Sequence, residues 1–204
     1  LVVAAGLLWV MGLVGASSSY RELSHLRGDQ TAVDQLDEHL FDTTHPVFRL
    51  QVEYQRAYLV ALGHHHDRAF PVALATLLLQ GLLVWAAGAL IAGRRNGRRL
   101  MLQALGTNAV MVVVGYLALA PARAEAMTVF AGEAATLRGL PAGPDQPTDE
   151  AIDFLVEQQP AQELGRTGAE VAFYLLVAMA LYRPRARTYF AALEENTVAD
   201  AEES

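Results

Sequence analysis

The sequence of 204 residues contains neither cysteine nor lysine. The absence of cysteine excludes disulfides, thiolate metal sites and cysteine nucleophiles. Any part of the chain outside a membrane must therefore hold its shape by packing alone. All fifteen basic residues are arginine, and a lysine-free chain rich in alanine, glycine, valine and leucine is typical of a GC-rich bacterial genome.

Several signatures of catalysis and cofactor binding are also missing. The sequence has no glycine-rich phosphate loop, no G-x-S-x-G motif and no H-E-x-x-H motif. Histidine is absent from every long apolar run, which argues against a haem held between membrane helices. No basic stripe indicates nucleic-acid binding. These absences favour a non-enzymatic protein with no nucleic-acid partner.

Long apolar runs are abundant, and they set the class of the protein. Hydrophobic residues make up 53% of the chain, and the mean hydropathy is +0.23. Residues 71–92 and 100–120 form two such runs on either side of 93–99, which carries four arginines. A helix rises about 1.5 Å per residue, so each run can cross a hydrocarbon layer of about 30 Å. The pattern predicts a transmembrane hairpin whose arginine-rich turn stays in the cytoplasm.

Two further apolar segments complete the predicted membrane part. We expect residues 1–17 to be a retained membrane helix rather than a cleaved signal peptide, although sixteen apolar residues are short for a span. Residues 168–182 form the last predicted span. The tail 183–204 begins with three arginines. This basic segment is expected on the same side of the membrane as the arginine-rich turn of the hairpin, the cytoplasm.

The distribution of charge orients the chain in the membrane. The two membrane-flanking clusters hold seven arginines, whereas the long loops 18–70 and 121–167 hold eight arginines and sixteen acids. The positive-inside rule places the loops outside and both termini in the cytoplasm. We therefore predict an all-α protein of the bacterial cytoplasmic (inner) membrane, with four transmembrane helices and a helical extracytoplasmic cap.

The first long loop is expected to be helical. The first span continues to Leu26, and Gly28 ends it. A short helix follows Thr31, and Pro46 opens a longer helix that runs to Leu62.

The second long loop is also expected to be helical. Residues 122–140 extend the third span, and the proline-rich segment 141–147 forms a turn. A helix then covers 149–159, and Pro160 begins the helix that enters the membrane as span four.

All six histidines fall in the first long loop. The densest cluster combines imidazole and carboxylate groups that suit a divalent metal such as zinc, copper or nickel, and consists of His64, His65, His66 and Asp67. Successive histidines cannot all point the same way, so a closed site must recruit an acid or His25, His39 or His45. A solvated polar stretch at the head-group level and a pH-sensing role are the alternatives.

Polar residues inside the predicted spans form a second group of candidates: Gln80, Gln103, Asn108 and Glu170. Gln80 and Asn108 reach similar depths on antiparallel helices, where an amide contact is worth on the order of 1 kcal/mol. They either hold the two helices together or form part of a polar pathway or ligand site. Gln103 and Thr107 extend this strip, which we expect to face the interior. Glu170 either pairs with Arg166 at the interface or handles a proton or cation.

Three functions fit these features. The first is an accessory or structural subunit of a larger bacterial membrane complex, in which the cap contacts a partner. Small residues at four-residue spacing, such as Gly12 with Ala16, favour close helix contacts and support it. The alternative is a small transporter, channel or metal-handling protein that uses the external histidines. A membrane enzyme acting at the outer surface is the third. The expected partners are the lipid bilayer and other membrane subunits or further copies of the chain.

Overall fold

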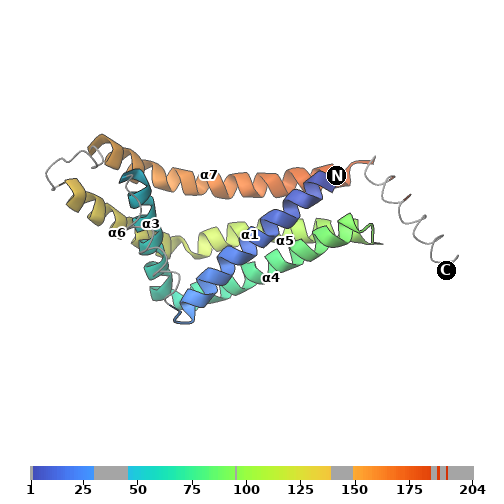
Figure 1. Ribbon diagram of the computed structural model, residues 1–204, viewed down its shortest axis with the longest axis horizontal. Helices are drawn as coiled ribbons and strands as arrows, with labels where there is room; N and C mark the ends of the chain where they lie inside the picture. Colours follow the sequence, from blue (N-terminus) through green and yellow to red (C-terminus); the bar gives the residue numbers. More distant parts are fainter. Residues whose placement is uncertain are drawn as a thin grey trace. The chain divides into compact units, whose positions relative to one another are not determined.

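The computed structural model describes residues 2–29, 46–94, 96–138, 149–184, 188 and 192. Six labelled helices account for most of these residues (Figure 1): α1 Val2–Leu26, α3 Pro46–His64, α4 His66–Ile91, α5 Gly97–Ala118, α6 Ala120–Arg138 and α7 Asp149–Tyr182. The described residues contain no strand, so the all-α prediction is confirmed. The short helix predicted after Thr31 and the turn predicted at 141–147 lie outside the described residues.

Three stretches of helix are long and apolar enough to cross a membrane: α4, α5 and Ile152–Tyr182 of α7. Their length and composition indicate a membrane protein. In the described part of the chain, α1 is not among these stretches. The fourth span and the extracytoplasmic cap stay predictions.

The chain divides into two compact units. Unit 1 consists of Leu1–Ser19, Leu74–Val114 and Thr167–Ser204. Unit 2 consists of Tyr20–Ala73 and Gly115–Arg166, and it contains the whole of α3 and α6.

The core of unit 1 follows helical spacing. The residues that α4 contributes to this core are Leu83, Ala86, Ala87 and Leu90, which share one helix face. They pack with residues of α1, α5 and α7 that include Leu8, Met101, Leu105, Tyr174 and Leu181. The opposite faces keep large apolar side chains exposed, as at Leu78 and Val110. Such faces suit a lipid environment.

The turn between α4 and α5 uses residues that tolerate unusual backbone angles. Gly93 and Asn96 have φ angles of 63° and 80°, in the left-handed region that glycine and asparagine adopt most readily. Gly97 then begins α5, and a Cβ atom there would lie 2.9 Å from the carbonyl oxygen of Ala89. Glycine therefore lets the two helices of the hairpin approach closely.

In unit 2, α3 packs against α6 along a stripe of small side chains. The buried residues of α6 recur every four positions, at Ala122, Ala126, Phe130 and Ala134. The rings of Tyr54 and Phe130 meet edge to face, with centroids 5.5 Å apart and planes at 77°. Alanine allows the close approach, and the aromatic pair adds specific geometry.

Proline positions explain where the helix bounds differ from prediction. The predicted start of a new helix at Pro160 is wrong, because α7 runs through it. Ile152, before Pro160, is buried, and Glu163, after it, forms an ion pair in the same unit. A helix break at Pro160 would separate these two residues. Tertiary contacts thus outweigh the local cost of proline. By contrast, the predicted continuous extension of span three is interrupted at Leu119, two residues before Pro121.

The other ends match more closely. The helix α1 ends at Leu26, as predicted, and Gly28 has a φ of 93°. The helix α3 continues through Gly63 to His64, and α4 begins at His66, earlier than the predicted residue 71.

The contact of α1 with α4 can be tested at Gly12. A Cβ atom there would lie 2.7 Å from Val84 Cγ2 and 3.3 Å from the carbonyl oxygen of Gln80. We expect Gly12→Leu to lower the free energy of unfolding by about 1–3 kcal/mol, measured by thermal unfolding in detergent. Gly6→Leu is the control, because a Cβ at Gly6 meets nothing within 4 Å. Equal stability of the two variants would contradict the packing.

Candidate functional site

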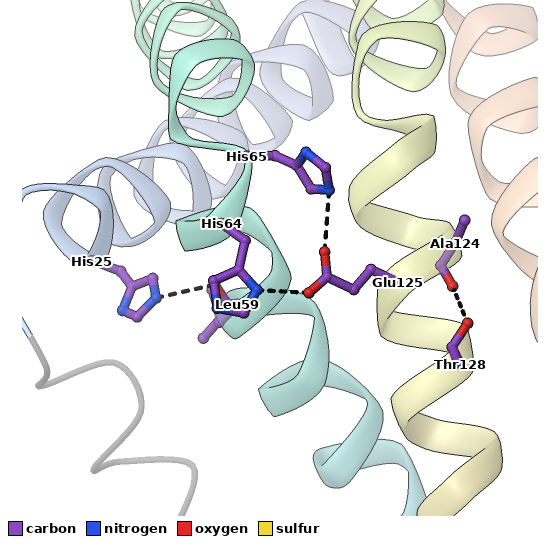
Figure 2. Close-up of polar contacts among 7 residues, drawn as sticks. All are labelled: His25, Leu59, His64, His65, Ala124, Glu125 and Thr128. Carbon is purple, nitrogen blue, oxygen red and sulfur yellow. Dashed lines mark hydrogen bonds and ion pairs between the residues drawn. The ribbon is translucent and has the colours of Figure 1, made fainter.

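Two histidines at the junction of α3 and α4 converge on one carboxylate of α6 (Figure 2). His64 Nδ1 lies 2.6 Å from Glu125 Oε1, and His65 Nε2 lies 3.1 Å from Glu125 Oε2. His65 is the single residue between the two helices, so the break there lets successive imidazoles face the same partner. All three residues belong to unit 2.

The shared carboxylate is an acceptor for both rings. The hydrogen bond that His64 donates holds the pKa of Glu125 below its ordinary value of 4.5, and the attraction of His65 acts in the same direction. The His64 side chain is 65% exposed and that of Glu125 36%, so water screens these contacts. The cluster therefore responds to pH but adds little to stability.

An open cavity of about 350 Å³ lies beside this cluster. Its lining includes His64, His65, Asp67 and Arg68. His66 takes no part in the lining, because its ring stacks on Phe70 with centroids 5.4 Å apart. Three of the four residues predicted as one metal site thus line the same cavity, and His66 does not.

The predicted metal site is incomplete in the described part of the chain. No group of three or more histidine, aspartate or glutamate side chains there could hold a metal ion. His25 is engaged elsewhere: its Nε2 lies 3.1 Å from the carbonyl oxygen of Leu59, as Figure 2 shows. His39 and His45 lie outside the described residues, so metal binding stays a prediction.

A second polar cluster of unit 2 joins α3, α6 and α7. Arg123 Nε lies 3.4 Å from Glu163 Oε2, and the hydroxyl of Tyr54 donates to the other carboxylate oxygen. The Arg123 guanidinium lies 3.8 Å from the ring centroid of Tyr116 and donates to the carbonyl oxygen of that residue. These side chains hold three helices and the end of α5 together.

Burial controls the ionisation of this second cluster. Burial, and then the hydrogen bond to Glu163, raise the pKa of Tyr54, so its hydroxyl keeps the proton that it donates. Burial also raises the pKa of Tyr58, with a further contribution from the charge of Glu22. Burial raises the pKa of Glu22 itself, and the positive charge of Arg166 lowers it by a smaller amount.

In unit 1 the polar residues hold helices together. Asn108 Nδ2 donates to the carbonyl oxygen of Leu79 at 3.1 Å and to that of Ala104 at 2.9 Å. Gln80 Nε2 instead lies 3.5 Å from the hydroxyl of Tyr174. Each amide thus takes its own partner, so the predicted contact between the two amides is corrected. A bond between membrane helices of this kind is worth on the order of 1 kcal/mol.

The other predicted intramembrane residues lie in different settings. Gln103 and Thr107 are exposed, whereas Gln80 and Asn108 are buried. The polar strip expected to face the interior is therefore half buried and half exposed. The Thr107 hydroxyl donates back to carbonyl oxygens of its own helix. Glu170 accepts a hydrogen bond of 3.0 Å from Tyr174, where the sequence predicts Arg166 as its partner.

Comparisons with protein-family models, curated proteins and solved structures find no match. The candidate site therefore rests on geometry. Glu125, Tyr174, Arg123 and Tyr54 are the residues that sequence reasoning missed. Glu125 stands 61 positions from His64, and no local pattern connects them.

The histidine–carboxylate cluster predicts a pH effect. Glu125 binds its proton less tightly in the folded chain, so its contribution is complete above pH 4.5 and is lost as the pH falls through the lowered pKa. We expect the melting temperature of the wild type to fall more steeply below pH 4.5 than that of Glu125→Gln. Thermal scans across this range measure the difference. Glu157→Gln, an exposed α7 carboxyl, is the control, and identical pH profiles for Glu125→Gln and wild type would refute the prediction.

Proposed function

We propose that the protein is a non-enzymatic accessory or structural subunit of a larger bacterial membrane complex, and that unit 2 is the extracytoplasmic cap that contacts the partner. One observation carries this proposal. The polar side chains of unit 2 clamp its helices to one another, whereas large apolar side chains on the same helices stay exposed.

The exposed apolar side chains occur on every complete helix of unit 2 and on α7. Four of them are 46–58% exposed: Val60 on α3, Val129 on α6, and Phe154 and Leu164 on α7. Apolar surface that faces water is unfavourable unless a partner covers it. Because polar contacts already hold the helices of unit 2 together, these helices lose little conformational entropy on binding, which favours contact with a partner.

The helix α7 is longer than the membrane is thick, which supports a part of the protein that lies outside the membrane. Its 34 residues correspond to about 51 Å, whereas the hydrocarbon layer is about 30 Å thick. The apolar half ends at Tyr182, and Asp149, Glu150, Asp153 and Glu157 lie in the other half. The charged half therefore suits water, and Phe154 belongs to it.

The proposed topology places the arginine clusters in the cytoplasm and unit 2 outside. Arg94, Arg99 and Arg183 are exposed, as expected of basic residues that lie in the water beside a membrane. The lipid partner is the bacterial cytoplasmic membrane, crossed by α1, α4, α5 and the end of α7.

The absence of cysteine makes this topology directly testable. A single introduced cysteine is the only thiol in the chain. We expect a membrane-impermeant maleimide to label Gln158→Cys in intact spheroplasts, and Thr188→Cys only after lysis. Both positions are exposed, so burial does not limit labelling. Labelling of Thr188→Cys in intact spheroplasts would overturn the orientation.

The partner surface is testable on α7. Extraction in mild detergent followed by native mass measurement should find the wild type in a stoichiometric complex. We expect the double variant Phe154→Ser, Leu164→Ser to lose roughly tenfold or more of the partner. The control is Gln158→Ser, Gln162→Ser, which changes exposed polar residues of the same helix. A monodisperse wild-type monomer would contradict the proposal.

A further inference from the structure

An apolar groove of about 220 Å³ opens on the surface of unit 1. Helices α1, α4 and α7 form its walls, with Leu8, Leu90 and Leu181 among the buried lining residues. Leu176 lines it too and is 61% exposed, so the groove is open along one side. All of its lining side chains are hydrocarbon. A groove of this kind in a membrane helix bundle can accept a lipid chain.

The length of the groove matches one leaflet of a membrane. On α7 the lining runs from Phe173 to Leu181. These residues span about 12 Å along the helix, close to the half-thickness of about 15 Å of the hydrocarbon layer.

Arginines stand at one end of the groove. Arg98 Nε donates a 2.9 Å hydrogen bond to the carbonyl oxygen of Leu181, a lining residue. This bond holds the guanidinium beside the end of the groove. Arg94 lies four residues after Leu90, in the turn that follows α4, Arg183 follows Leu181 by two residues, and both arginines are exposed. The groove thus runs from hydrocarbon depth to a cluster of positive charge.

We propose that this groove binds an anionic phospholipid of the arginine-flanked leaflet, with one acyl chain in the groove and the phosphate at Arg98. A guanidinium can donate two parallel hydrogen bonds to a phosphate, and basic residues at the membrane surface favour anionic lipids. Arg94 and Arg183 add to the attraction. The argument uses unit 1 alone, so it does not depend on the partner of unit 2.

Native mass spectrometry of the whole chain in neutral detergent tests the head group. Phosphatidylglycerol and phosphatidylcholine with identical acyl chains are the probes. We expect about tenfold stronger retention of phosphatidylglycerol by the wild type. Arg98→Gln should reduce this preference to near one, whereas Arg99→Gln, which changes an exposed neighbour, should keep most of it. If Arg98→Gln does not fold, Arg94→Gln with Arg183→Gln should lower the preference instead.

Filling the groove tests the acyl chain. Ala180 lines the groove, and Ala172 is exposed on the same helix outside it. We expect Ala180→Phe to lower the retention of both lipids about tenfold, and Ala172→Phe to leave both unchanged. Equal retention of the two lipids by the wild type, or unchanged retention by Ala180→Phe, would overturn the proposal.

Discussion

A backbone inside hydrocarbon has no water to bond, so every N–H and C=O group must find its partner within the protein. The apolar runs of this chain meet that demand as the long helices α4, α5 and α7. The same demand applies to the buried side chains, which meet it in part: Gln80 Oε1 is buried without a hydrogen-bond partner. Asn108 bonds the backbone of the neighbouring helix, and Gln80 reaches the hydroxyl of Tyr174. Polar groups that would be costly in lipid thereby become the contacts that hold unit 1 together.

Unit 2 uses a different chemistry, because packed alanines alone bury little apolar surface. Arg123 and Glu163 are 15% and 23% exposed, so their ion pair is shielded from water and salt more than a surface pair. Tyr54 and the ring of Tyr116 surround the same charges. Removal of one member would leave the opposite charge partly buried without compensation, which is strongly destabilising. A chain without disulfides can thus keep a fixed helical arrangement.

Local features of the sequence predict the ends of helices well where one residue decides the backbone. Gly28 adopts a positive φ after α1, and the arginine-rich turn lies between α4 and α5, both as predicted. The predicted helix start at Pro160 is wrong because contacts on both sides of this residue keep α7 continuous. The partners of Asn108 and Glu125 could not be predicted. Depth in a membrane follows from counting residues, whereas the choice of partner depends on helix rotation and on segments far away in sequence.

An exposed apolar side chain has opposite meanings along α7. Leu176, near the end of the helix, is 61% exposed within an apolar stretch, where lipid would cover it without cost. Phe154 is 57% exposed, but Asp153 and Glu157 flank it, and their charges need water. In the proposed topology, one half of the helix presents its apolar side chains to lipid and the other half to water. Only the apolar surface in the acidic half lacks a cover that the bilayer could supply, and this difference is why a protein partner is proposed for that half and a lipid for the other.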